Sequence, residues 1–398
     1  MGSGRIISIG SVQIGGGLPV ALQSMAAVKT ADVQAVADTC RHLADAGAAI
    51  IRLAVDTPAD AKALKAIRKE IRKRTDVNLS VDLQENYRLA ENVAPFVDKI
   101  RYNPGHLHHS EPETAWQTKV ERIVQTAEKY DCALRIGVNC GSLDPALLNN
   151  SAINNSAGKT YVPALTSALQ HSEFLDSLGF TRYCVSIKSS DPKTFTAVNR
   201  HFAAMRPDVP LHLGLTEAGL PPAGIQKSRL ALEPLLADGI GDTLRVSLTV
   251  PNERKHEEIE AGRLIVQNAA AGNILTEEHW HVDTWNIISC PSCARVENDR
   301  FVQLAEQVHE AVQKLRQDLE TDWKDAPLTI AVMGCRVNGP GETDRADIGL
   351  WCGKTSVNLK SGTELIGSFG YSEVIEEMLR LVRKVLLRHS LNRLSAAS

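Results

Sequence analysis

The chain has 398 residues, 43% of them hydrophobic and 23% charged, which is enough for two or three domains with a large buried core. A net charge of -3 and an aromatic content of 5% argue against nucleic-acid binding. No apolar run of about 18 residues is present, which excludes an ordinary membrane span, and the first ten residues lack a secretion-signal pattern, so we expect a cytoplasmic protein.

Short apolar segments alternate with segments of helical periodicity over roughly the first 270 residues. Strands are predicted at 20–25, 48–55, 78–83, 98–103, 133–139, 182–189, 211–217 and 243–249. Helices are predicted at 33–46, 59–73, 113–129, 164–178, 192–206 and 224–238. Eight strands in this alternation predict an α/β fold, a (β/α)8 TIM-like barrel over residues 1–270. A doubly wound open sheet is the alternative, but no Gly-x-Gly-x-x-Gly follows the first strand, and residues 15–17 are interpreted as a turn.

The alternation of strands and helices is interrupted twice. Residues 140–162 are rich in Asn, Ser and Gly and are predicted to form a mobile loop at the active face of the barrel. The pattern breaks again around 270–280. Beyond it we predict a small α+β domain over 281–398, with helices at 298–318 and 373–388 and strands at 328–335 and 347–352.

The predicted barrel strands carry polar residues where core strands would carry Val or Ile. Residues two apart share a face of a strand, and barrel active sites lie at the strands' C-terminal ends. Four arginines and one lysine at one mouth call for an anionic ligand, and a diphosphate suits them better than one carboxylate. The competing interpretation pairs each Arg with a neighbouring acid. The residues are Arg52, Arg101, Asn103, Arg135, Asn139, Ser186, Lys188, Arg245 and Ser247, with His212 beside them and Asp82 and Glu217 ending strands.

Three of the eight cysteines form a candidate metal site. Cys290-Pro-Ser-Cys293 is followed by Cys335, which stands before a Gly-Pro-Gly turn. Thiolates select zinc or iron–sulfur, and zinc would want a fourth Cys or His close by, which does not follow Cys335. Glu342 is the nearest further candidate ligand. Three thiolates and one displaceable carboxylate suit a [4Fe–4S] cluster that reacts with an oxygen of its substrate.

Seven segments together resemble the 4-hydroxy-3-methylbut-2-enyl diphosphate synthase family (IspG, also called GcpE). They occur in the family's order over nearly the whole chain, and the last four are highly specific together. They are Gln-Ser-Met at 23–25, Arg-Tyr-Asn-Pro-Gly at 101–105, Arg-Ile-Gly-Val-Asn-Cys-Gly-Ser-Leu at 135–143, His-Leu-Gly-Leu-Thr-Glu-Ala-Gly at 212–219, Gly-Ile-Gly-Asp-Thr-Leu-Arg-Val-Ser-Leu at 239–248, Cys-Pro-Ser-Cys at 290–293 and Gly-Cys-Arg-Val-Asn-Gly-Pro-Gly-Glu at 334–342.

The resemblance implies a homodimeric iron–sulfur enzyme of the methylerythritol phosphate route to isoprenoids. It would open the ring of 2-C-methyl-D-erythritol 2,4-cyclodiphosphate reductively, with loss of water and with single electrons from flavodoxin or ferredoxin. Carried over residue by residue, it makes Glu217, Asp82 and Glu342 catalytic, with Glu217 the proton donor. The cluster ligands would be Cys290, Cys293, Cys335 and Glu342. The substrate would be held by Arg52, Arg101, Asn103, Arg135, Asn139, Lys188, His212, Arg245 and Ser247.

The chain departs from the family pattern near the barrel mouth. Ala26, Ala27 and Val28 stand where the family has Thr-Asn-Thr, Gln84 stands where it commonly has His, and Leu-Pro-Pro-Ala at 220–223 replaces a glycine-rich loop. Two alternatives stay open, and these departures support only the first of them. One is a paralogue that uses the same cluster chemistry on another phosphorylated substrate. The other is an anion-binding barrel with a structural zinc site.

Overall fold

A computed structural model describes the chain at residues 3–149, 161–280, 282–296, 298–319, 323, 326–335 and 337–397, with side chains described as far as residue 388. The chain divides into two compact units. The first comprises Met1–Thr216, Ser228–Ser247 and Asn252–Leu275, and the second comprises Glu217–Lys227, Leu248–Pro251 and Thr276–Ser398. Two short segments of the predicted barrel, 217–227 and 248–251, thus pack with the C-terminal residues.

The first unit contains an eight-stranded sheet in the order β8-β7-β6-β5-β4-β3-β10-β9, with every neighbouring pair parallel. The strands are β3 (Ala21–Met25), β4 (Ile50–Ala54), β5 (Asn78–Gln84), β6 (Lys99–Tyr102), β7 (Ala133–Asn139), β8 (Tyr183–Lys188), β9 (His212–Leu213) and β10 (Thr243–Leu244). A parallel bridge from Val185 to Leu211 joins the two edges of the sheet. The (β/α)8 barrel is confirmed.

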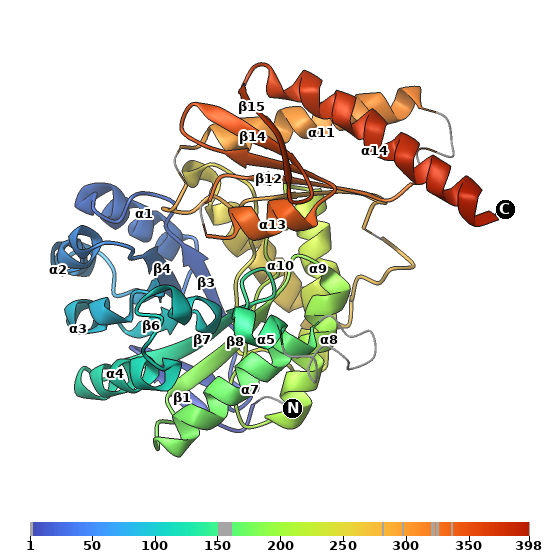
Figure 1. Cartoon of the computed structure of the whole chain (residues 1–398). Helices are drawn as coiled ribbons and strands as arrows, with labels where there is room; N and C mark the ends of the chain where they lie inside the picture. The colour runs from blue at the N-terminus through green and yellow to red at the C-terminus, as the bar shows by residue number, and fades with distance from the viewer. Residues whose placement is uncertain are drawn as a thin grey trace. The chain divides into compact units, whose positions relative to one another are not determined.

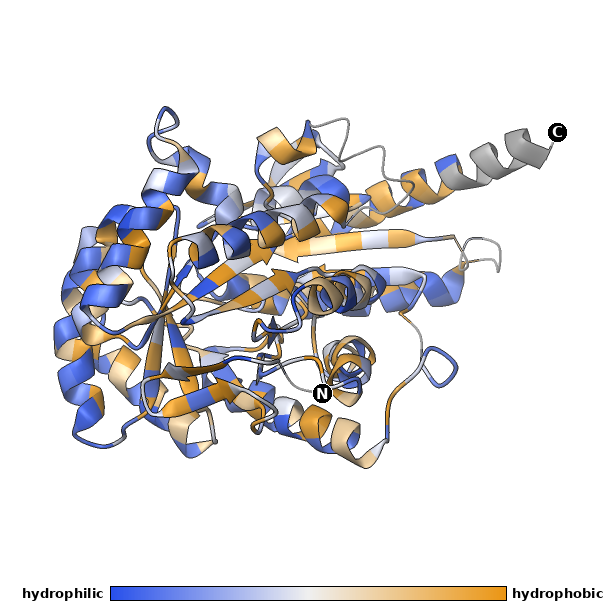
Figure 2. Cartoon of the chain, turned by 90° about the horizontal axis from the view of Figure 1, so that it is seen from below, coloured by the Kyte–Doolittle hydropathy of each residue, from blue (hydrophilic) through white to orange (hydrophobic). Residues whose placement is uncertain are grey.

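Helices surround these strands (Figure 1). Several of them begin at a residue whose side chain caps the helix N-terminus. Thr57 and Asp60 form a reciprocal capping box, and Asp32 and Asp191 cap two other helices. In Figure 2 the helices around the barrel carry both blue and orange segments, as expected for helices with one face against the strands. The helices are α1 (Val33–Asp45), α2 (Pro58–Arg72), α3 (Ala90–Val93), α4 (Trp116–Lys129), α5 (Pro145–Leu148), α7 (Val162–Ser177), α8 (Pro192–Met205), α9 (Ala223–Ala237) and α10 (His256–Ala271), with 3-10 turns η1 (Tyr87–Leu89), η2 (Ala94–Phe96), η3 (Pro104–His109) and η4 (Asn252–Arg254).

An N-terminal hairpin that the sequence analysis missed covers the amino-terminal end of the barrel. It pairs β1 (Ile6–Ile9) with β2 (Val12–Gly15). Its buried isoleucines join one apolar cluster with Ile50 and Ala133, which begin two barrel strands. The turn expected at 15–17 is confirmed, with positive φ angles at all three glycines. Gly15 is required because a Cβ there would lie 1.9 Å from the Arg5 carbonyl oxygen.

Three expected strand boundaries were wrong. The predicted strands at 211–217 and 243–249 are reduced to β9 and β10, so Arg245 and Ser247 follow a strand instead of lying within it. The Arg245 N–H still donates to the Leu213 carbonyl oxygen, but such bonds are too sparse there to form a ladder. Asp82 does not end its strand, because β5 continues to Gln84.

The predicted loop at 140–162 is described only at its ends. It contains the short helix α5 before Asn149, and α7 begins at Val162. Residues 150–160 lie outside the described residues, so the loop's mobility stays a prediction.

The second unit is built on a five-stranded sheet in the order β11-β12-β13-β14-β15. Its first three strands are parallel and its last two pairs are antiparallel. Helices α11 and α14 lie on one face and α13 on the other (Figure 1). The sequence analysis missed β11, β14 and β15, and the Gly-Pro-Gly segment begins a helix instead of forming a turn. The elements are β11 (Trp285–Ser289), α11 (Arg300–Asp318), β12 (Leu328–Met333), α13 (Gly339–Arg345), β13 (Ile348–Cys352), β14 (Ser356–Ser361), β15 (Glu364–Gly370) and α14 (Val374–Ala397).

All eight cysteines carry free thiols in this structure. Among the described residues, we find no helix that combines the length and the apolar character needed to cross a bilayer.

Candidate active site

Five cationic side chains of the first unit lie close enough to repel one another. Lys188, the last residue of β8, has a pKa well below its usual value, because it is buried and because all four arginines of the set repel its charge. Those arginines come from β4, β6, β7 and the segment after β10. The structure thus brings Arg52, Arg101, Arg135, Lys188 and Arg245 together, as their strand positions predicted.

One carboxylate stands among these cations. Asp82 is 1% exposed, and its Oδ1 accepts a hydrogen bond from Arg101 Nη1 at 2.7 Å, while Oδ2 lies 3.7 Å from Arg52 Nη1. In the described part of the chain the other three cations form no ion pair with an acid. The alternative in which each Arg pairs with its own acid therefore does not describe this site.

Arg135 carries the least satisfied charge of the set. It is 1% exposed, and Nη1 donates to Ser186 Oγ at 3.2 Å, while Nε and Nη2 have no hydrogen-bond partner among the described residues. Burial and the repulsion from Arg101 lower the pKa of Arg135 to about 10, so it remains charged at neutral pH. A buried cation with two unused donors is stable only with a strong acceptor, and an oxyanion supplies one.

Two guanidinium groups approach a sulfur atom that cannot neutralise them. Arg52 Nη2 lies 2.6 Å and Arg245 Nη1 3.6 Å from Met25 Sδ, and a thioether is only a weak acceptor. Arg245 also donates to Ser247 Oγ. Ser247 therefore orients Arg245, whichever ligand the set receives.

His212 lies at the same site as a neutral imidazole. Burial first, and then the neighbouring cations, lower its pKa well below the usual value. Its Nδ1 is 2.7 Å from Thr243 Oγ1, and its Nε2 is buried without a hydrogen-bond partner in the described part of the chain. A neutral ring with one nitrogen held leaves the other available to a ligand.

Lys99 is a sixth buried cation, which the sequence analysis missed. Its Nζ donates to Gln23 Oε1 at 2.8 Å, and burial is the main cause that lowers its pKa to about 8. The signal was present, because Lys99 and Arg101 are two residues apart in β6 and share a face.

Two predicted binding residues have side chains engaged by the protein itself. Asn103 Oδ1 accepts from the Gly105 N–H, and its Nδ2 donates to Gln84 Oε1 and to Ser142 Oγ. Asn139 Oδ1 accepts from the Gly141 N–H. Gln84 also donates to Asp82 Oδ2, so it connects Asn103 to the carboxylate of the cation set. These contacts assign both asparagines at least a structural role.

Replacing Arg135 by methionine is expected to stabilise the ligand-free protein, because the change removes a buried cation without an acidic partner. The free energy of unfolding in urea should rise by about 1–4 kcal/mol. Pyrophosphate should raise the melting temperature of the wild type and raise that of the variant less, since ligand stabilisation follows affinity.

The matched control is Arg206→Met. Arg206 is only partly buried, with 13% of its side chain exposed, and it forms ion pairs with Asp176 and Asp208, so its loss should destabilise the protein and leave the pyrophosphate effect unchanged. A destabilised Arg135→Met variant that still responds fully to pyrophosphate would contradict the assignment of an anion site.

One cysteine of the second unit, Cys335, lies against two others. Cys290, Cys293 and Cys335 are all buried, and the thiol of Cys335 lies within hydrogen-bonding reach of both others. The hydrogen bond with Cys290 raises the pKa of Cys335 to about 12, and contact with Cys335 raises that of Cys293. A bound metal would reverse this effect, because its charge favours thiolates.

The backbone after Cys335 is arranged to receive negative charge. The N–H groups of Val337 and Asn338 point at Cys335 Sγ from 3.3 and 3.4 Å. Thr249 Oγ1 donates to the Cys290 carbonyl oxygen at 3.0 Å. Ser292, between the paired cysteines, has a φ of 54°, which bends this segment tightly. N–H donors to a ligating sulfur are the groups that tune iron–sulfur centres.

Two buried glutamates flank this part of the second unit. Glu342 is 3% exposed and lies on α13, seven residues after Cys335. Glu217 is 1% exposed, has a φ of 49°, and accepts a hydrogen bond from Asn338 Nδ2 at 3.1 Å. Asn338 was missed by the sequence analysis, although it stands inside the cysteine motif. It connects Glu217 to the loop that carries Cys335.

The donor set fits an iron–sulfur cluster. Three soft thiolates, backbone N–H groups directed at a sulfur and a buried carboxylate on the helix that follows Cys335 are groups that such a cofactor uses. Cys352 is buried on β13, and burial raises its pKa to about 12. It shows no contact with the other three cysteines.

Comparison with known proteins gives matches over nearly the entire chain. Residues 4–263 match the family described as GcpE TIM-barrel domain, and residues 286–384 match the GcpE protein C-terminal domain. A Rhodopirellula baltica protein named 4-hydroxy-3-methylbut-2-en-1-yl diphosphate synthase (flavodoxin) is 53% identical over 374 residues, which is 94% of each chain. Proteins of the same name from Nitratiruptor sp. and Persephonella marina are each 37% identical, over 95% and 94% of this chain and 96% of their own length.

Proposed function

Since the chain belongs to the GcpE family of 4-hydroxy-3-methylbut-2-en-1-yl diphosphate synthases, we propose that it converts 2-C-methyl-D-erythritol 2,4-cyclodiphosphate into 4-hydroxy-3-methylbut-2-enyl diphosphate in the methylerythritol phosphate pathway. Two electrons and two protons enter, a carbon–oxygen bond of the ring breaks, and one water leaves. The observation that supports this substrate best is the buried, uncompensated positive charge around Arg135.

The cation set would hold the diphosphate. Arg135, Lys188 and Arg245 lack acidic partners among the described residues, so the phosphate oxygens would be their counter-charge. Arg101 and Arg52 are fixed by Asp82 and would orient the same group. His212 would donate or accept one hydrogen bond through Nε2. Because these cations are already in place, binding costs little reorganisation.

Glu217 would deliver the proton that leaves with water. The Asn338 amide holds one of its carboxylate oxygens, which fixes the direction of the other. This carboxyl group is 1% exposed, so it is shielded from bulk water, as a positioned proton donor requires. The positive φ at Glu217 marks a strained backbone of the kind found at functional sites.

Cys290, Cys293, Cys335 and Glu342 would hold a [4Fe–4S] cluster, with flavodoxin or ferredoxin as the electron donor. When bound, the cluster supplies single electrons and a Lewis-acidic iron. Glu342 would be the exchangeable ligand, because a carboxylate oxygen is displaced more readily than a thiolate. We also propose that the enzyme works in the cytoplasm, where cysteines stay reduced and can bind a cluster.

The deciding experiment is turnover of the cyclodiphosphate by anaerobically reconstituted protein with an artificial one-electron donor. Formation of the hydroxybutenyl diphosphate is the expected result. That result would show that the enzyme tolerates the departures from the family pattern at Ala26, Ala27, Val28 and Gln84. A brown, reducible but inactive protein would favour the paralogue, and colourless protein with stoichiometric zinc would favour the structural metal site.

We also propose that the active form is a homodimer in which one subunit supplies the cation set and the other the cysteines. Two inactive variants, Arg135→Met and Cys335→Ser, should then restore activity when they are mixed and reassembled. Half of the dimers would be mixed, each with one intact site, so about a quarter of the wild-type rate is expected. No recovery, with mixed dimers demonstrated by differential tags, would place both groups in one subunit.

A further inference from the structure

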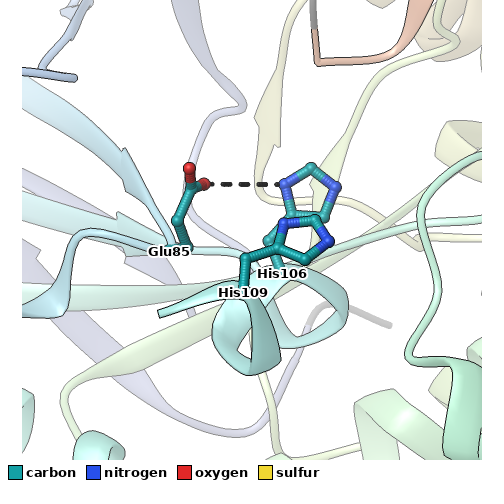
Figure 3. Close-up of side chains that lie close together, drawn as sticks. All are labelled: Glu85, His106 and His109. Carbon is teal, nitrogen blue, oxygen red and sulfur yellow. Dashed lines mark ion pairs between the residues drawn. The ribbon is translucent and has the colours of Figure 1, made fainter. Parts of the chain in front are cut away.

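Two histidines and a glutamate gather at the carboxyl-terminal side of the barrel, outside the cation set. Glu85 follows the last residue of β5, and His106 and His109 lie on η3, which begins two residues after β6 (Figure 3). One ligand atom from each side chain lies within 4.8 Å of the others. The segments that bear them are 21 residues apart in sequence, so the barrel topology creates the cluster.

The three side chains already approach the spacing of a metal site. His106 Nδ1 lies 3.7 Å from Glu85 Oε2. Metal bonds of about 2.0–2.2 Å place tetrahedral ligand atoms about 3.3–3.6 Å apart, so small side-chain rotations would complete the geometry. The rings of His106 and His109 are stacked at a tilt, with centroids 4.8 Å apart. His106 is buried, Glu85 half-buried and His109 exposed, so the cluster has a rigid base and an open side.

We propose that Glu85, His106 and His109 bind a divalent first-row transition metal such as Zn²⁺. Two imidazole nitrogens and one carboxylate oxygen form a donor set that these metals prefer, whereas Mg²⁺ and Ca²⁺ require oxygen ligands. Three protein ligands leave at least one coordination position for water or an anion. The site is separate from the cysteines, which belong to the other compact unit.

The local electrostatics are compatible with this ligand set. Burial tends to raise the pKa of Glu85, but the hydrogen bond with His106 and the nearness of both histidines lower it overall. Glu85 therefore stays ionised. Burial first, and then the two neighbouring histidines, lower the pKa of His109, which keeps that ring neutral and able to bind a metal.

Metal binding would stiffen the backbone beside the cation set. Glu85 is bonded to Gln84, whose side chain donates to Asp82 and accepts from Asn103. A metal that joins Glu85 to η3 would therefore restrain the backbone at both ends of this series of hydrogen bonds. The series of hydrogen bonds continues from Asp82 to Arg101. The metal would therefore help to position Arg101 in the anion site.

The test is Zn²⁺ binding by the anaerobic, full-length protein, measured by calorimetry and by metal analysis after dialysis. The wild type should bind one Zn²⁺ more per chain than His109→Gln or Glu85→Gln. Affinity at that position should fall at least roughly tenfold, which is the lower end of the cost of losing even an outer-shell partner. Both variants are mild, because His109 is exposed and glutamine retains the shape of Glu85. The difference between the proteins isolates this site, whatever the cysteines hold.

Two controls define the result. His42→Gln removes an exposed histidine of the same unit that is remote in sequence. This variant should bind Zn²⁺ like the wild type. Mg²⁺ should not compete with Zn²⁺ in any of the proteins. Zn²⁺ should also raise the melting temperature of the wild type more than that of His109→Gln. Equal Zn²⁺ stoichiometry and affinity in the wild type and both variants would overturn the proposal.

Discussion

Replacing Cys335 by serine is expected to give a colourless protein that contains neither iron nor acid-labile sulfide and has no turnover. Cys335 is the thiol that contacts both other cysteines, and it receives two backbone N–H groups. A serine oxygen is a poor ligand for iron beside two thiolates, and a cluster held by the remaining pair would be lost. Iron and sulfide analysis with the visible spectrum measures the outcome.

Cys352→Ser provides the matched control. Cys352 belongs to the same unit and is buried to a similar extent, but it lies on β13 without contact to the three cysteines. This variant should retain iron, colour and activity. If instead Cys335→Ser were fully loaded and Cys352→Ser were colourless, the ligand assignment would move to Cys352.

Changing Glu217 to glutamine is expected to leave the cluster in place and to lower kcat by roughly a hundredfold to ten-thousandfold, which is the usual contribution of a positioned proton donor. The amide retains the size of the side chain and can still accept from Asn338. What it loses is the exchangeable proton. The iron content and the visible spectrum should match the wild type, while product formation by the anaerobic enzyme measures the loss.

Glu278→Gln makes the same chemical change at an exposed position of the same unit and should not affect the rate. The kcat of Asn338→Ala should lie between those of Glu217→Gln and Glu278→Gln, because the carboxyl group remains but its orientation is no longer fixed. Normal turnover by Glu217→Gln would remove this residue from the mechanism and would direct attention to Asp82, the carboxylate of the cation set.

The barrel and its cations could be predicted because both depend on local patterns. A buried strand such as Ile50–Ala54 is visible as an apolar run, and Arg52 within it is conspicuous because burial of a charge is costly. Lys99 has the same signal but was missed. The hairpin β1–β2 was missed because two strands of four residues give too little alternation to distinguish them from a loop.

The contacts between distant segments could not be predicted in this way. Nothing in the local sequence relates Glu217 to Asn338, because their hydrogen bond joins residues 121 positions apart. The approach of Glu85 to His106 and His109 likewise depends on the loops of adjacent strands meeting. The short β9 and β10 also reflect tertiary constraints, since their apolar patterns continue beyond the last ladder bond.

The two short segments that pack with the second unit determine how the protein can be divided into fragments. Ala218 bridges to Ser289, and Thr249 bonds both the Ser289 hydroxyl and the Cys290 carbonyl oxygen. A fragment that begins at residue 276 or 281 would therefore lack the chain that anchors its first cysteine pair, together with Glu217 itself. The cysteine-bearing unit is assembled from three stretches of sequence, so a fragment cut before its longest stretch would contain only part of that unit.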